Sequence, residues 1–247
     1  MATESTLGLS LLAEVARLGL PVLGDSRGGR PIHGGLVPGG AAATGRPLVV
    51  MGGIHGDEPA SVGACLDLLD RLAQTDPGLT ALSAPVVVVP ALNPDGLVYG
   101  TKNSAADVDL NRNFPARNFV TEHKPGYCPG PAPLSEPETA AFAALLEAHP
   151  PLGVVAVHAP FACINHDGGA AAWAEAVALA SGWPARADLG YPTPGSLGSW
   201  LGVDRGLPVL TIELPPGPLA DFRTAGLAAL VAAVTMFPGA SGPGRAA

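Results

Sequence analysis

Four short apolar runs constrain the fold of this chain more than any other feature of its sequence. The runs lie at residues 47–53, 85–92, 152–158 and 207–214. Each has the length of a buried β-strand and is too short for a buried helix. Apolar residues recur with helical spacing at residues 58–74, 136–149, 170–181 and 218–235. Strands that alternate with helices predict an α/β fold in which helices flank a mixed central sheet.

The chain of 247 residues is short enough to form one domain. A helical pattern at 7–18 and a glycine-rich hairpin at 24–35 predict an N-terminal preface, residues 1–46, packed on the same domain. We expect the catalytic domain to span 47–237 and residues 238–247 to form a disordered tail, because the tail has little apolar content. Proline and glycine are too frequent in 115–135 for regular structure, and we expect this loop to border the active site.

Charge and cysteine content exclude several classes of partner. The net charge is −8 and the 13 basic residues are scattered, so we expect neither a nucleic acid nor a membrane surface as partner. Three cysteines without a CxxC pair argue against a disulfide framework. The N-terminus lacks the pattern of a signal peptide, which predicts a cytoplasmic protein. The oligomeric state is left open.

Polar residues that could carry chemistry follow the apolar runs. His55 and Glu58 come directly after the first run, His158 ends the third, and Glu213 lies near the end of the fourth. Ligands of open α/β sheets bind at the carboxyl ends of the strands, where these side chains should meet. Two histidines and one carboxylate form a catalytic zinc site with a fourth position for water. We therefore predict one zinc ion held by His55, Glu58 and His158.

The alternative for each histidine is a hydrogen-bonded structural residue. A lone histidine at a strand end favours that alternative, but the set with Glu58 and Glu213 favours the metal site. We place Asp109 as a candidate to orient one of the ligating imidazoles. The other histidines, His33, His123, His149 and His166, have no comparable context, although His166 with Asp167 follows the third run closely enough to approach the site.

Other catalytic motifs are missing from the sequence. Ser196 and Ser199 lie in a glycine-containing turn, but neither stands in a G-x-S-x-G motif after a strand. The glycines of residues 24–35 fit neither the dinucleotide nor the phosphate-loop spacing, so no nucleotide is expected.

An ordered set of motifs resembles the zinc carboxypeptidase (carboxypeptidase A-like) family. The motifs are HGDE at 55–58, NPDG at 93–96, DLNRNFP at 109–115 and IELPP at 212–216, and the resemblance covers residues 47–215. It implies the carboxypeptidase fold, the same zinc ligands and Glu213 as the residue that activates water.

The resemblance also implies roles in binding substrate. Asn111 and Arg112 match the residues that grip the carboxylate of the substrate, and Tyr191 matches a tyrosine that closes over it. Lys102 stands where the family usually has an arginine that stabilises the oxyanion; it can supply the charge but not the planar guanidinium. Ala159 replaces a residue that is often polar in close relatives.

Longer matches, among them VDLNRNFPA at 108–116 and GYPTPGSLGSW at 190–200, resemble one branch of this family. Its members cleave the amide bond between γ-D-glutamate and meso-diaminopimelate in cell-wall peptides, which implies a small peptide substrate with a free carboxylate. Two alternatives stay open: a zinc-dependent deacylase of N-acyl amino acids, similar to succinylglutamate desuccinylases, and a non-catalytic peptide-binding protein that keeps the fold.

Overall fold

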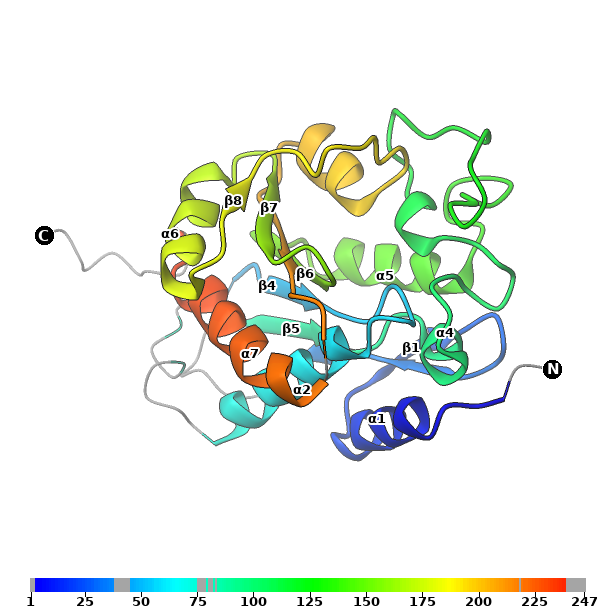
Figure 1. Ribbon diagram of the computed structural model, residues 1–247, viewed down its shortest axis with the longest axis horizontal. Helices are drawn as coiled ribbons and strands as arrows, with labels where there is room; N and C mark the ends of the chain where they lie inside the picture. The colour runs from blue at the N-terminus through cyan, green and yellow to red at the C-terminus, as the bar shows by residue number, and fades with distance from the viewer. Residues whose placement is uncertain are drawn as a thin grey trace, which may run out of the picture.

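The computed structural model describes residues 3–37, 45–74, 79, 82, 84–217 and 219–238. Of the predicted tail, residues 239–247 lie outside this part of the chain. A seven-stranded mixed sheet forms its centre, in the order β3-β5-β4-β6-β9-β7-β8 (Figure 1). The strands are β3 (Gly35–Leu36), β4 (Leu48–Met51), β5 (Val86–Val89), β6 (Gly153–His158), β7 (Cys163–Asp167), β8 (Ala185–Arg186) and β9 (Val209–Glu213).

The four predicted strands form the parallel centre of this sheet. β4 pairs with β5 and β6, and β6 pairs with β9, all in parallel. β3 is antiparallel to β5, β7 is antiparallel to β9, and β8 runs parallel to β7. The parallel strands consist almost entirely of buried apolar residues because helices and turns cover both faces.

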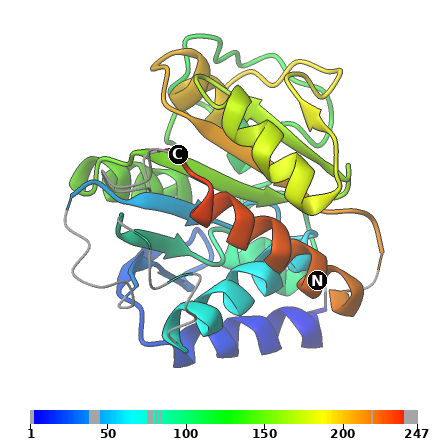
Figure 2. The ribbon, with the colours of Figure 1, turned by 90° about the vertical axis from the view of Figure 1, so that its left-hand side faces the viewer.

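Two apolar layers enclose the sheet. Three helices lie side by side on one face, as Figure 2 shows: α2 (Pro59–Ala73), α6 (Ala171–Ser181) and α7 (Leu219–Thr235). The other face is covered by α5 (Pro137–Ala148), by the 3₁₀ turn η1 (Leu110–Arg112) and by the π-helical turn η2 (Gly198–Val203). Side chains alternate along each strand, so Val154, Ala156 and Val209 face α5 and η2. By the same alternation, His158 and Glu213 belong to that face.

The N-terminal segment packs against this framework. It contains α1 (Thr6–Arg17) and the antiparallel hairpin of β1 (Val22–Asp25) and β2 (Pro31–His33), and α1 packs on α2 and α4 (Pro94–Tyr99). Arg27 in the hairpin turn pairs with Glu136 at 2.9 Å, directly before α5. Arg30 pairs with the fully buried Asp95 of α4 at 2.6 Å. The hairpin thereby links the starts of two helices.

The predicted α/β fold, with its mixed sheet between helices, is confirmed. The hairpin at 24–35 and the helices after each strand also lie where their patterns predict them. The sequence patterns missed β3, β7, β8, α4 and the turn η2. The division of the chain at residues 46 and 237 stays a prediction. No helix among the described residues combines the length and the apolar character needed to span a bilayer.

Candidate metal centre and active site

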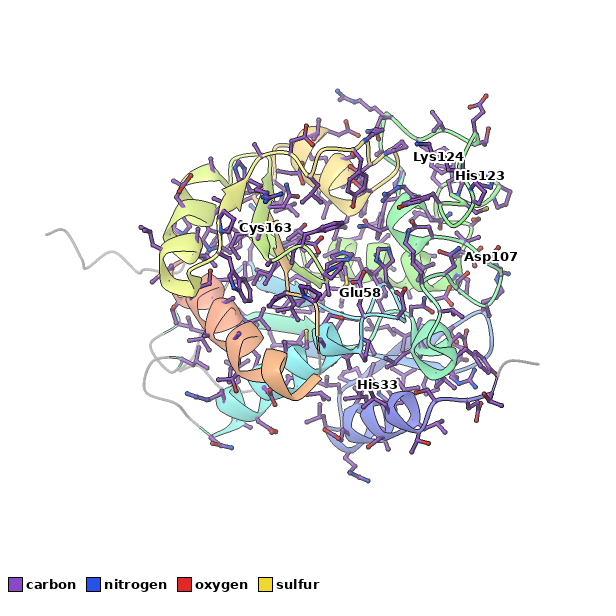
Figure 3. The ribbon with its side chains drawn as sticks, viewed as in Figure 1. His33, Glu58, Asp107, His123, Lys124 and Cys163 are labelled. Atoms are coloured by element: carbon purple, nitrogen blue, oxygen red, sulfur yellow. The ribbon has the colours of Figure 1, made fainter. Side chains whose placement is uncertain are left out.

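Three side chains that could hold a metal come together beyond the ends of β4 and β6. His55 lies in the turn between β4 and α2, and Glu58 takes the N-cap position of α2. The carboxylate of Glu58 makes no capping hydrogen bond with the helix and turns instead toward the histidines. His158 is the last residue of β6. In Figure 3, Glu58 lies near the middle of the molecule, within the framework of the sheet.

The spacing of these side chains suits a zinc ion. One carboxylate oxygen of Glu58 lies 2.8 Å from His55 Nδ1, and the other lies 3.1 Å from His158 Nδ1. These distances resemble the roughly 3.3 Å that separates two ligands of a tetrahedral zinc ion. One ligand atom from each residue lies within 4.8 Å of the other two. The donor set, two imidazoles and a carboxylate, is that of a catalytic zinc site.

Asp109 reaches the far side of the His55 ring. Its Oδ1 lies 3.1 Å from His55 Nε2, and its Oδ2 accepts a hydrogen bond of 2.6 Å from Lys102 Nζ. The carboxylate is fully buried. A hydrogen bond from Nε2–H to Asp109 leaves Nδ1 with its lone pair toward the metal position, which is the arrangement expected for orienting a ligating imidazole.

The charges of this cluster depend on one another. Burial lowers the pKa of His55, but hydrogen bonds to Asp109 and Glu58 outweigh it and raise the pKa to about 9. Burial raises the pKa of Glu58, but the two histidines outweigh it and lower the pKa to about 2. The pKa of Asp109 also falls below its usual range because His55, Arg112 and Lys102 outweigh its burial. The neighbouring carboxylates therefore favour the protonated, positively charged form of His55.

Glu213 lies beside the metal ligands at the end of β9. The parallel register of β6 and β9 pairs Glu213 with His158. Glu213 is 4% exposed, and its Oε2 has no hydrogen-bond partner among the described residues. Burial and the charge of Glu58 raise the pKa of Glu213, against the lowering effects of His158, His55 and the backbone of Phe161. A carboxylate with an unpartnered oxygen and a raised pKa is suited to accept a proton.

All the predicted site residues line one pocket of about 200 Å³. These residues are His55, Glu58, Lys102, Asn111, Arg112, His158, Tyr191 and Glu213. Arg112 is buried, and its guanidinium lies 5.5 Å from the centre of the Tyr127 ring. Tyr191 is 38% exposed at the mouth, next to Phe161. The pocket thus has a metal-ligating end, a cationic wall and a rim of aromatic rings.

Lys102 does not point freely into the pocket. Its ammonium donates to Asp109 and to the backbone oxygen of Gly126 at 3.1 Å, and it lies 3.8 Å from the centre of the Tyr127 ring. The same lysine therefore lines the pocket and neutralises the carboxylate behind His55. Its predicted role toward an oxyanion stays a prediction.

The loop 115–135 borders the site, as its composition predicts. A second pocket, of about 510 Å³, adjoins the first through Arg112, Tyr127 and Tyr191. Its outer wall comes from the loop and includes His123 and Lys124, which Figure 3 places away from Glu58 at the outer side of the molecule.

The side chain of Asn113 joins the two ends of this loop by hydrogen bonds. Its amide nitrogen donates to Pro129 O at 2.7 Å, to Ala132 O at 3.0 Å and to Ser135 Oγ at 2.9 Å. Its amide oxygen accepts from Thr139 Oγ1 at 2.6 Å, in the first turn of α5. One buried residue therefore joins the two ends of the loop.

Sequence patterns did not single out Asn165 and Thr211, which line the pocket, whereas Asp167, expected near the site together with His166, does line it. Asn165 and Asp167 belong to β7, a strand without an apolar run; the alternation of side chains after residue 163 was the available signal. His166, which we placed close to the site, is not among the residues that line the pocket. Ser196 lines it but bonds only to neighbouring hydroxyl and backbone groups, as expected for a serine without a catalytic role.

Comparisons with known proteins agree with this geometry. The zinc carboxypeptidase family profile matches residues 16–174. Murein peptide amidase A of Escherichia coli (strain K12) is 37% identical over 187 residues, which cover 71% of this chain and 74% of that protein.

Solved structures extend the likeness to the fold. The crystal structure of the murein-tripeptide amidase from Escherichia coli O157 has a TM-score of 0.71 and 31% identity, covering 88% of this chain and 95% of that one. Carboxypeptidase A from Helicoverpa armigera has a TM-score of 0.73 at 17% identity, covering 92% and 70%, which is a likeness of fold alone. The chain therefore belongs to the zinc carboxypeptidase family, whose members are hydrolases of peptide and amide bonds with zinc as their cofactor.

Proposed function

We propose that this protein is a zinc-dependent amidase that hydrolyses the bond between γ-D-glutamate and meso-diaminopimelate in cell-wall peptides. The observation that carries the proposal is the placement of Glu213, with an unpartnered oxygen, beside the His55, Glu58 and His158 cluster in one pocket. The substrate follows from the likeness to the murein peptide amidases, which extends over most of the chain.

Glu213 carries the proton transfers in this proposal. Bound zinc would polarise the scissile carbonyl and lower the pKa of a water molecule. Glu213 accepts the proton of the attacking water at its unpartnered Oε2 and then delivers that proton to the leaving amine. The raised pKa of Glu213 favours the first of these transfers, because a more basic carboxylate accepts a proton more readily.

The cationic wall of the pocket binds and orients the substrate. Arg112, in the turn η1, grips the α-carboxylate of the leaving residue, since a guanidinium can bind a carboxylate with two parallel hydrogen bonds. Asn111 supports this grip, and Tyr191 closes over the bound peptide from the mouth. Lys102 offsets the negative charge that develops on the carbonyl oxygen during attack.

The role of Glu213 is tested by Glu213→Gln, a change of similar size that removes the base. We expect kcat to fall by roughly 10²-fold to 10⁴-fold while the protein retains its zinc. Glu175→Gln, on the exposed face of α6, is the matched control and should keep full activity. A Glu213→Gln protein with bound zinc and undiminished turnover would exclude Glu213 as the base.

The substrate is tested by a panel of three peptide types on the zinc-loaded protein. L-Ala-γ-D-Glu-meso-diaminopimelate should be hydrolysed with the highest kcat/KM. Ordinary peptides with a C-terminal L-residue should be poorer substrates, and N-succinyl or N-acetyl amino acids should not be hydrolysed. A preference for the N-acyl amino acids would favour the deacylase, and bound zinc without any hydrolysis would favour a peptide-binding protein.

We also propose that the protein acts in the cytoplasm on small peptides derived from the cell wall. All three cysteines are free thiols, which suits a reducing compartment. Fractionation of cells that produce the full chain would test this; recovery from an extracytoplasmic fraction would contradict it.

A further inference from the structure

Tyr127 lines the substrate pocket but has no role in the proposed mechanism. It belongs to the loop 115–135 and borders both the inner pocket around the metal ligands and the larger outer pocket. Its side chain is 42% exposed, so packing in the apolar core does not account for its position. The ring instead lies against the two cations of the inner pocket, Lys102 and Arg112.

The distances from this ring to both cations are short enough for attraction. Lys102 Nζ lies 3.8 Å from the ring centre, and Arg112 Cζ lies 5.5 Å from it. An aromatic face attracts a cation within roughly 6 Å. Two like charges in one pocket repel each other, and the ring offsets part of that repulsion. Only 28% of the Lys102 side chain and 5% of Arg112 are exposed, so solvent screens these attractions only in part.

A tight turn presents the ring to Lys102. Residues 124–127 read Lys-Pro-Gly-Tyr, with proline at the second position and glycine at the third. Gly126 has a φ of 80°, which the third position of a type II turn requires. The turn is closed by a hydrogen bond of 3.0 Å from Tyr127 N to Lys124 O. It thereby brings the carbonyl group of Gly126 and the ring of Tyr127 to the same ammonium group.

The position of the Lys102 ammonium depends on three partners. It donates to Asp109 Oδ2 at 2.6 Å and to Gly126 O at 3.1 Å, which leaves the last of its three hydrogens for the ring of Tyr127. A lysine carries its charge on a flexible stem, so these partners and not the stem fix the ammonium. Loss of the ring removes one of the three and lets the ammonium turn toward solvent.

We propose that Tyr127 is a positioning residue, whose ring holds Lys102 and Arg112 in the arrangement that acts on the substrate. This inference rests on the proposed function for the roles of the two cations. The ring lies closer to Lys102 than to Arg112. Its loss should therefore affect the step in which Lys102 offsets the developing negative charge more than the binding of the carboxylate by Arg112.

Kinetics of two variants on L-Ala-γ-D-Glu-meso-diaminopimelate test the role of the ring in the zinc-loaded protein. Tyr127→Leu keeps an apolar side chain but removes the ring; kcat should fall roughly 3-fold to 30-fold, as for a partly desolvated cation–π contact, and KM should rise by a smaller factor. Tyr127→Phe keeps the ring and should stay within about 2-fold of the unchanged protein. Equal losses in the two variants, or no loss in either, overturn the inference.

Tyr99→Leu is the matched control. Tyr99 is similarly exposed, at 37%, and its ring lies 5.2 Å from the guanidinium of Arg30, but it lines neither pocket. This variant should keep full activity. A loss as large as that of Tyr127→Leu would show that removal of any exposed tyrosine has this effect, and it overturns the inference.

A graded series at position 127 separates the charge of the ring face from its shape. Mono-, di- and trifluorophenylalanine keep nearly the same shape, while each added fluorine weakens the negative face of the ring. The value of kcat should fall stepwise from phenylalanine through this series. A series without such a decrease overturns the inference. These variants also keep it testable if Tyr127→Leu fails to fold, which its melting temperature shows.

The chemical reactivity of Lys102 distinguishes this inference from the proposed function. The chain has two lysines, Lys102 and Lys124, and Lys124 is exposed in the same turn. Brief acetylation of the zinc-loaded protein with acetic anhydride, followed by mass spectrometry of its peptides, gives both rates without any substrate. The ratio of Lys102 to Lys124 acetylation should rise roughly 3-fold to 30-fold in Tyr127→Leu and stay unchanged in Tyr127→Phe. That result supports the inference even if no peptide is hydrolysed; equal ratios in all three proteins overturn it.

Discussion

At the scale of single residues, the site is a chain of charges that runs through His55. Lys102 neutralises one oxygen of Asp109, the other oxygen faces His55 Nε2, and Nδ1 of the same ring faces Glu58. Each contact fixes the next side chain in position. Lys102 therefore helps to position the metal ligand His55 through Asp109, without contacting His55 itself.

Zinc uptake should release a proton from His55. The pKa of this ring in the metal-free protein is about 9, so the ring is protonated at neutral pH, whereas a zinc ligand must be neutral. Between pH 6 and 8 we expect the apparent zinc affinity to rise about tenfold per pH unit. Calorimetry at pH 7 in buffers of different ionisation enthalpy measures the released proton. His123→Gln, outside the cluster, should leave the release unchanged; a binding enthalpy that does not depend on the buffer would contradict the prediction.

Asp109→Asn should weaken zinc binding roughly 10-fold to 100-fold, because an amide orients the imidazole less firmly than a carboxylate and does not raise its basicity. Competition with a chromophoric chelator measures the affinity. Asp107→Asn is the matched control: Asp107 has a φ of 58°, where asparagine is tolerated, and lies at the edge of the molecule away from Glu58 (Figure 3). Equal affinity in the two variants would show that Asp109 does not act on the metal through His55.

At the scale of elements, strand register and one tight turn bring the site together. Parallel pairing of β6 and β9 brings His158 and Glu213 to the same level, and the turn after β4 carries His55 and Glu58 beside them. Within that turn, Gly56 packs on the backbone of α4 so closely that a Cβ atom would overlap Gly96.

Gly56→Ala should disturb the fold and the metal site together. The added methyl group forces the turn away from α4, and overpacking of this kind costs about 1–3 kcal/mol of the free energy of unfolding. The free energy of unfolding, measured with denaturant, and the zinc content should both decrease. Gly169→Ala is the control, because nothing lies within 4 Å of a Cβ atom there. A Gly56→Ala protein with unchanged stability and zinc content would show that the turn adjusts without cost.

At the scale of the whole molecule, zinc joins segments from different parts of the sequence. His55 and Glu58 come from the first third of the chain, and His158 comes from β6 about a hundred residues later. The apolar layers on both faces of the sheet contain none of these three residues. The metal therefore adds one further link to a framework that has its own extensive apolar core.

Removal of zinc with a chelator should lower the melting temperature without unfolding the protein at room temperature. Binding to the folded state alone stabilises by about 4 kcal/mol when free zinc exceeds its dissociation constant about 1,000-fold. Circular dichroism at increasing temperature, with and without chelator, measures the difference. His158→Gln should melt at a temperature that responds much less to zinc. Identical melting of the loaded and the stripped protein would contradict a metal shared between α2 and β6.

The sequence predicted the parallel centre of the fold because those strands are buried on both faces and read as continuous apolar runs. It missed β7 because Asn165 and Asp167 face a pocket, which breaks the apolar run. It missed α4 because this helix has only six residues and begins at Pro94. The metal residues were predictable from spacing and position after strands. The contact of Lys102 with Asp109 was not, because no periodic pattern relates two residues across an irregular loop.

The hydrogen bonds of Asn113 also affect how this protein and its relatives can diverge in sequence during evolution. Its side chain joins the two ends of the loop 115–135, and further hydrogen bonds hold the loop at Arg117, Asn118 and Gly126. The residues between these contacts form the wall of the outer pocket. Insertions or exchanges within that wall can reshape the outer pocket while the residues around His55 and Glu213 keep their positions. Exchange of this loop between relatives, with Asn113 retained, is therefore a route to a new peptide preference with an unchanged metal centre and an unchanged Glu213.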